Sequence, residues 1–195
     1  MYLNGDPALE VSDWTIGKCG LRTGDDLDDR TIEKIKSSEA ETQAKNIAIN
    51  YLSYRPRSSK EIIDHLTKKG YSRACAEDVT CQLQSVRMVN DLEFARAFVR
   101  DRLKRKPTGQ ALLRMQLRAK GIPSSMVDTV LTELISLQSQ QASALQAAKR
   151  KIQLTQYSKR NPDEEKRKKH LLEFLLRRGF SYEIALKAIH TTLDR

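Results

Sequence analysis

Apolar residues recur along most of this chain at intervals of three and four, the spacing that places side chains on one face of an α-helix. Three of these stretches contain a similar element, which reads "HLTKKGY", "QLRAKGI" and "FLLRRGF". In each element a leucine precedes a glycine by four residues, and a large apolar residue follows the glycine. Aligning Gly70, Gly121 and Gly179 also aligns apolar positions on both sides, which indicates an internal repeat of helices.

The element around each glycine is predicted to end a helix. With the glycine in the left-handed conformation, the leucine and the apolar residue make the hydrophobic contact of a Schellman motif. The basic residues beside it then occupy the last helical turn, where the helix dipole favours cations. A phosphate-binding loop needs the opposite end of a helix, so this element is not predicted to be one. The predicted pairs are Leu66 with Tyr71, Leu117 with Ile122 and Leu175 with Phe180.

The helix signals on either side of each glycine predict an all-α fold, a tandem array of three three-helix repeats. Ser58 and Glu61 form a capping-box pattern at the start of the helix before Gly70. Asn161 and Pro162 give the equivalent start before Gly179. The predicted domains are a small acidic N-terminal extension and three repeats, over residues 1–43, 44–86, 87–137 and 138–195.

The N-terminal extension has its own pattern. Asn4-Gly5 lies between two short apolar runs and predicts a β-hairpin, which Pro7 weakens because proline cannot donate to a ladder. Two short helices are then predicted, one from Ser12 to Gly20 and one beginning at Asp28 or Asp29.

Charge is distributed unevenly along the chain. The net charge is +10, but residues 1–43 carry a net of −5 and residues 44–195 a net of +15. A basic body of this size favours polyanionic partners, which are nucleic acid, anionic membranes or acidic protein surfaces.

Cysteine usage and hydropathy predict a cytoplasmic protein with no membrane partner. Cys19, Cys75 and Cys81 are odd in number and lack the spacing of a metal site, which is typical of a reducing compartment. The N-terminus lacks the basic and apolar regions of a signal peptide. No run of about 18 apolar residues occurs.

No pattern typical of catalysis occurs. His65, His170 and His190 are scattered, and the HExxH, CxxC, GxSxG and glycine-rich nucleotide-binding motifs are absent from the sequence. We therefore expect no enzyme activity, no catalytic residue, no metal ion and no cofactor.

Two helices joined by a glycine turn also match the outline of a DNA-binding helix-turn-helix. Its recognition helix would follow the glycine and approach the DNA backbone. The helices after the glycines carry few bases and several acids, which would repel that backbone, so this motif is disfavoured. The acids are Glu77, Asp78, Asp128, Glu133 and Glu183.

Basic residues gather instead on the helices before the glycines and at the repeat junctions. Arg96, Arg100 and Lys104 form a row with helical spacing, and Arg114 and Arg118 form another. One such row is typical of a solvated helix face, but rows in tandem repeats favour a ribbon of positive charge along an extended polyanion or filament. The candidate contact residues are Arg55, Arg57, Arg96, Arg100, Lys104, Arg105, Lys106, Arg114, Arg118, Lys120, Lys149, Arg150, Lys151, Lys168 and Lys169.

Three ordered segments carry a family resemblance. They read "YLSYRPRSSKEIIDHLTKKGY", "MVNDLEFARAFVRDRL" and "PTGQALLRMQLRAKGI", and they resemble the successive signature segments of the RecX family of bacterial recombination regulators. The likeness covers residues 44–195, is strongest over 50–135 and weakens in the third repeat. The matching signature positions are Arg55, Pro56, Arg57, Gly70, Asn90, Asp91, Phe94, Ala95, Gly109, Leu117, Lys120 and Gly121.

The resemblance implies a modular fold of three-helix repeats and a protein partner. Members of this family bind the filament of the RecA recombinase on single-stranded DNA and inhibit its ATP hydrolysis, strand exchange and coprotease activity; some also bind DNA. Most signature positions resemble caps, turns and core, so contacts are expected on the basic rows of a monomer. Two alternatives stay open, a stand-alone basic nucleic-acid-binding helical protein and a helical scaffold for another acidic protein.

Overall fold

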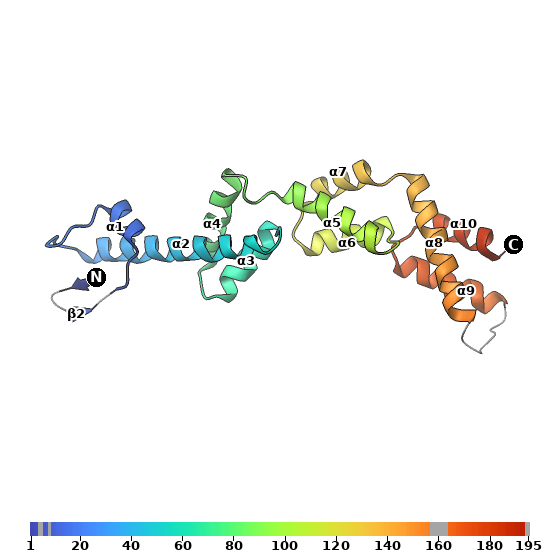
Figure 1. Cartoon of the computed structure of the whole chain (residues 1–195), viewed down its shortest axis with the longest axis horizontal. Helices are drawn as coiled ribbons and strands as arrows, with labels where there is room; N and C mark the ends of the chain where they lie inside the picture. Colours follow the sequence, from blue (N-terminus) through green and yellow to red (C-terminus); the bar gives the residue numbers. More distant parts are fainter. Residues whose placement is uncertain (4–5, 8, 157–163, 194–195) are drawn as a thin grey trace. The chain divides into compact units, whose positions relative to one another are not determined.

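The computed structural model describes residues 1–3, 6–7, 9–156 and 164–193 (Figure 1). The all-α fold of three-helix repeats is confirmed, and a two-residue antiparallel ladder lies near the N-terminus, between β1 (Tyr2–Leu3) and β2 (Asp6–Pro7). The helices are α1 (Asp13–Cys19), α2 (Asp29–Ser53), α3 (Ser59–Lys68), α4 (Arg73–Ser85), α5 (Asp91–Arg105), α6 (Gln110–Ala119), α7 (Ser124–Leu134), α8 (Leu137–Gln156), α9 (Glu164–Arg177) and α10 (Tyr182–Leu193).

The chain forms two compact units, residues 1–90 and 91–195. In the first unit α1 lies beside the N-terminal part of α2, and α3 and α4 pack against the C-terminal part (Figure 1). The core of this bundle is apolar and fully buried, because each helix turns one periodic face inward. Its buried residues are Ala44, Ala48, Ile62, Leu66, Ala76, Val79, Leu83 and Val89.

One boundary in the first unit differs from the sequence prediction. The helix that begins at residue 29 and the first helix of the first repeat form one 25-residue helix, α2. No glycine or proline interrupts residues 29–53, so nothing in the chain breaks the helix there. The predicted domain boundary after residue 43 therefore falls inside α2, and the domain boundaries stay predictions.

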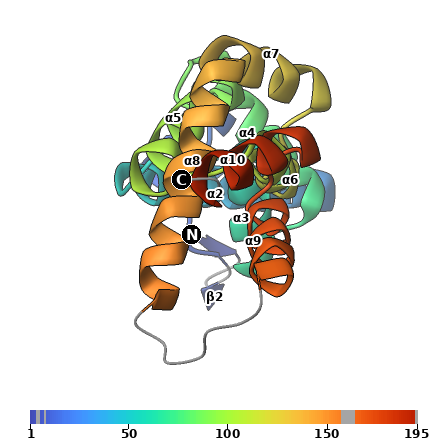
Figure 2. The ribbon, with the colours of Figure 1, turned by 90° about the vertical axis from the view of Figure 1, so that its right-hand side faces the viewer.

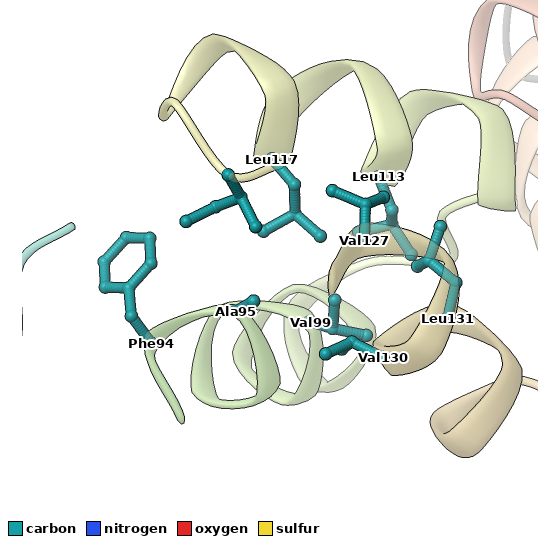
Figure 3. Close-up of a cluster of buried hydrophobic side chains, with 9 residues drawn as sticks. Phe94, Ala95, Val99, Leu113, Leu117, Val127, Val130 and Leu131 are labelled. Carbon is teal, nitrogen blue, oxygen red and sulfur yellow. The ribbon is translucent and has the colours of Figure 1, made fainter. Parts of the chain in front are cut away.

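The second unit contains two further three-helix bundles. In the first of them, residues from α5, α6 and α7 point toward one another, including Phe94, Val99, Leu113 and Leu131 (Figure 3). In the second, α8, α9 and α10 pack together around small alanines of α8 and larger residues of α9 and α10 (Figure 2). The small side chains of α8 let the helices approach closely.

The predicted ends of the helices before the three glycines are confirmed. Gly70, Gly121 and Gly179 have left-handed backbone angles, with φ of 96°, 80° and 84°. The N–H of the following residue donates to the carbonyl of the predicted leucine each time, which is the long hydrogen bond of a Schellman motif. The bonds are Tyr71 to Leu66 at 3.2 Å, Ile122 to Leu117 at 3.1 Å and Phe180 to Leu175 at 3.2 Å.

Several predicted helix starts are also confirmed. Ser12 and Asp28 accept hydrogen bonds from the backbone of Thr15 and Thr31, and Ser58 forms the predicted capping box. The predicted turn at Asn4-Gly5 and the predicted start at Asn161 and Pro162 lie outside the described residues.

A buried carboxylate fastens the N-terminal extension to α2. Glu39 accepts hydrogen bonds from the N–H of Ser12 at 2.9 Å, from the hydroxyl of Ser12 at 2.8 Å and from Gln43 at 3.0 Å. Burial opposes its ionisation, but the interactions with Ser12, Thr15 and Gln43 outweigh burial and lower the pKa of Glu39 from 4.5 to about 2. The ionised carboxylate therefore stabilises the docking of α1.

Backbone hydrogen bonds join the two bundles of the second unit. The N–H groups of Gly109 and Ala111 donate to the carbonyls of Arg178 and Gly179, at 2.8 and 3.1 Å. A side chain on Gly109 would overlap the backbone of Gly179, so glycine is required there for the backbones to meet.

Buried polar side chains complete this junction. Thr108 and Gln140 are buried, and Gln140 accepts from the N–H of Gln110 at 3.1 Å and donates to the carbonyl of Thr108 at 3.4 Å. The amide of Gln140 thus satisfies backbone groups that the junction removes from water, as buried polar groups require.

Glu39→Gln is expected to loosen α1 from α2 at neutral pH, because a neutral amide replaces a charged acceptor whose removal costs about 1–3 kcal/mol. Hydrogen exchange of residues 12–20 measures this loosening. In the native chain, protection should be constant above pH 4.5 and should fall as the pH drops from 4.5 toward 2, since the native carboxylate is protonated only near 2. Glu33→Gln on the exposed face of α2 is the control, and equal loosening in both variants would contradict this role.

Gly179→Ala is expected to destabilise the protein more than Gly70→Ala. Both substitutions force alanine into a left-handed conformation, which costs about 1 kcal/mol. Only at Gly179 does the added carbon meet a neighbour, Leu112, so overpacking adds about 1–3 kcal/mol there. Denaturant unfolding of the two variants measures the difference, and equal losses would show that the junction contributes nothing.

Candidate functional site

The two units differ in charge. Residues 1–90 contain 13 Lys and Arg against 14 Asp and Glu, a net of −1. Residues 91–195 contain 22 against 11, a net of +11. The attraction for polyanions that the sequence predicts is therefore a property of the second unit.

Arg96, the first residue of the predicted row on α5, is already engaged. Its guanidinium contacts Glu93 on α5 at 2.6 Å and Glu133 on α7 at 2.9 Å, and its side chain is 25% exposed. Hydrogen bonds to Glu133 and then Glu93 raise the pKa of Arg96. This arginine links α5 to α7, so its charge is largely neutralised within the unit.

Other candidates are paired in the same way. The carboxylate of Asp128 on α7 lies 2.6 Å from Arg114 on α6. Arg55, Arg105 and Lys168 contact carboxylates at 2.9–3.1 Å, and Lys151 lies 5.7 Å from the ring centre of Phe174. Lys120 is half-buried. For the residues with these contacts, a structural role accounts for part or all of the charge.

The remaining candidates of the second unit are exposed cations. None of them forms an ion pair with another residue that the structure describes. Two, Arg100 and Lys104, lie one helical turn apart on α5. They are Arg100, Lys104, Lys106, Arg118, Lys149, Arg150 and Lys169, and we refer to them as the unpaired cations.

The first unit contains a stack that sequence reasoning did not find. The guanidinium of Arg57 lies 3.8 Å from the ring centre of Tyr51, and the imidazole of His65 lies 3.9 Å from it with ring planes 4° apart. Burial, and then Lys69, Arg57 and Lys68, lower the pKa of His65. The available signal was the alternation of aromatic and basic residues in "YLSYRPR", of which only Arg55 and Arg57 are among the predicted contact residues.

Within the described parts of the chain, no cluster of three His, Cys, Asp or Glu side chains could hold a metal ion. None of the helices there combines the length and the apolar character that a membrane span requires.

Comparison with known proteins identifies one family. Residues 44–83 match the RecX first three-helix domain, and residues 90–131 match the RecX second three-helix domain. The chain is 32% identical over 195 residues to the regulatory protein RecX of Bacillus pumilus, covering all of this chain and 72% of that one. It is 36% identical over 158 residues to RecX of Prosthecochloris aestuarii, covering 80% of this chain and 96% of that one.

A solved structure agrees with these sequence matches. The crystal structure of a regulatory protein RecX superimposes with a TM-score of 0.78 at 26% sequence identity, covering 94% of this chain and 88% of that chain.

Arg118→Gln and Arg114→Gln form a matched pair on α6. Losing the exposed, unpaired charge of Arg118 is expected to weaken binding to single-stranded DNA and to reduce the slope of log K against log[salt] by about 0.7. Losing Arg114, which is paired with Asp128, should leave that slope unchanged and lower stability by less than about 1 kcal/mol. Salt titrations of binding and denaturant unfolding measure both effects, and equal slope changes would contradict the distinction between paired and unpaired cations.

Proposed function

Because this chain belongs to the RecX family of regulatory proteins, we propose that it binds the RecA recombinase filament on single-stranded DNA and inhibits its activities. The inhibited activities are ATP hydrolysis, strand exchange and coprotease cleavage in recombination and repair. The observation that carries the proposal beyond family membership is the net charge of +11 on residues 91–195, with its unpaired cations on α5, α6, α8 and α9.

The physical basis is electrostatic and multivalent. A nucleoprotein filament repeats its phosphates and its protein surfaces along one axis, and a protein with cations on successive helices can contact several repeats at once. Each phosphate contact releases counterions, so such binding strengthens at low salt. A ligand that binds one state of the filament more tightly shifts the filament toward that state.

Inhibition of this kind requires no chemistry by the protein itself. We propose that the chain is a non-enzymatic, monomeric regulator that acts in the cytoplasm, where RecA and its DNA are found. Its modules in this proposal are the three-helix repeats over residues 44–86, 87–137 and 138–195.

A second candidate function rests on the same charge. A basic protein with a net of +11 on one unit would bind nucleic acid without any protein partner. In that case binding to bare DNA would be strong and steeply dependent on salt, and RecA would add nothing to it.

Addition of excess protein is expected to suppress DNA-dependent ATP hydrolysis by the cognate RecA, and the protein should sediment with RecA filaments more than with bare DNA. A triple variant, Arg100→Gln with Lys104→Gln and Arg118→Gln, should require a higher concentration for both effects, because it removes three unpaired cations. ATPase assays and co-sedimentation with RecA present or omitted measure these outcomes.

The control for this experiment is a second triple variant with the same change of charge on the exposed face of α2. It carries Arg30→Gln, Lys34→Gln and Lys36→Gln, and it should behave like the native protein. Unchanged hydrolysis with excess protein bound to the filament would contradict inhibition, and equal sedimentation with bare DNA would favour the second candidate function.

A further inference from the structure

We propose that the first unit holds a contact for single-stranded nucleic acid where α2 ends and α3 packs against it. In this contact Tyr54 stacks on an unpaired base, while Arg57, Lys68 and Lys69 neutralise neighbouring phosphates. The inference deepens the proposed function by adding a strand contact outside the basic second unit, and it rests on that function only for its biological setting.

The geometry begins with a three-layer stack. The guanidinium of Arg57 and the imidazole of His65 both lie within 4 Å of the ring centre of Tyr51, so they must occupy opposite faces of that ring. Tyr51 therefore holds Arg57 in one orientation. A guanidinium stacked on an aromatic ring keeps its charge, and the N–H groups at its edge can still reach a phosphate.

Arg57 is incompletely satisfied by the protein. Its Nε is buried and has no hydrogen-bond partner, and Arg57 forms no ion pair with another described residue. Arg55, two residues earlier, differs because Glu61 neutralises it at 3.1 Å. The buried Nε is out of reach of a ligand, so a phosphate would bind the other N–H groups of the guanidinium, whose charge no described carboxylate neutralises.

Two lysines extend the positive charge. Lys68 and Lys69 follow His65 by three and four positions at the end of α3, so they lie about one helical turn beyond it, and Arg57 lies across the ring of Tyr51 from it. Lys68 and Lys69 are exposed, and neither forms an ion pair within the described part of the chain. Three unpaired cations, Arg57 before the start of α3 and Lys68 and Lys69 at its end, therefore lie along α3 in a unit whose net charge is near zero.

Tyr54 supplies an open aromatic surface three residues after Tyr51 and three before Arg57. It lies at the end of α2, on the same side of the chain as Tyr51, and it is 83% exposed. Both faces of Tyr51 are covered, but no ring or cation contact covers Tyr54 among the described residues. Exposed aromatic rings next to cations are the usual platform for the bases of a single strand.

The acidic extension lies far from the Tyr54 end of this surface. The extension docks on α2 through Glu39 and Glu41, and α1 and α3 lie toward opposite ends of that helix (Figure 1). Fifteen residues of helix separate Glu39 from Tyr54, a distance of about 20 Å. Since charges are screened over about 8 Å at physiological ionic strength, Glu39 does not act on the Tyr54 end of the surface, although its charge does reach Tyr71, two residues after Lys69.

The chemistry favours a single strand over the other polyanions. An acidic peptide offers charge but no base to stack on Tyr54. A duplex offers charge with its bases already paired and stacked, so Tyr54 would gain nothing from it. Single-stranded nucleic acid supplies both groups that this surface lacks.

The test is the affinity of the full-length protein for a fluorescent oligothymidylate without RecA. Tyr54→Ala is expected to weaken binding by about tenfold, the usual effect of losing one stacked base, whereas Tyr54→Phe should bind like the native chain. Tyr182→Ala is the matched control, because Tyr182 is 58% exposed on α10, where no such set of cations has been described. Since Tyr54 is on the surface, thermal unfolding of all three variants should match the native protein.

The salt dependence separates the two kinds of contact. Tyr54→Ala should leave the slope of log K against log[salt] unchanged, and Lys68→Gln with Lys69→Gln should reduce it by about 1.4, or 0.7 per phosphate. An oligothymidylate containing 5-iododeoxyuridine should form a photo-crosslink to the peptide that holds Tyr54, and the crosslink should disappear in Tyr54→Ala.

Three results would overturn the proposal. The first is unchanged affinity of Tyr54→Ala for the oligothymidylate. The second is that Tyr54→Ala loses as much affinity for a duplex of the same length as for the single strand. The third is that the native protein binds polyglutamate as tightly as the oligothymidylate, which would assign the surface to acidic proteins. RecA is absent from these measurements. Failure of RecA inhibition would therefore leave this contact standing, and failure of this contact would leave RecA inhibition standing.

Discussion

Each three-helix repeat depends on one turn, in which a left-handed glycine ends the second helix and lets the third return across the first. The turn is held by the backbone bond from the residue after the glycine to a buried leucine carbonyl, and by the apolar contact between those two residues. Without the reversal, the apolar faces of helices such as α3 and α4 would have no common core to enter. The same turn occurs at Gly70, Gly121 and Gly179, so one local constraint sets the chain reversal inside each of the three repeats.

The features that could be predicted from the sequence are those formed by residues close together along the chain. The glycine turns, the capping box at Ser58 and the cap at Ser12 each rest on residues within a few positions of one another, and all were found. Contacts between distant residues could not be read in this way. The junction at Gly109 joins segments 70 residues apart. The spacing of apolar residues does not predict that the backbone of Gly109 will contact that of Gly179.

The candidate site shows the same limit. Helical spacing correctly placed Arg96, Arg100 and Lys104 along α5, but spacing cannot reveal that Glu133, on another helix, neutralises the first of them. The division into paired and unpaired cations is tertiary information, and it changes which charges are available to a partner. In the first unit, spacing likewise cannot reveal that His65, on α3, stacks on Tyr51 of α2.

The junction between the second and third bundles also bears on how such a chain can change. Gly70 ends its helix in open space, whereas Gly179, the matching position of the third repeat, is enclosed by Leu112 and by the segment around Gly109. Similar sequence elements therefore occupy unequal surroundings. Deleting the third repeat would strip acceptors from the N–H groups of Gly109 and Ala111, and reordering the repeats would bring side chains where only hydrogen fits. The second and third repeats are therefore not interchangeable units, although their sequences share the same helix-ending element.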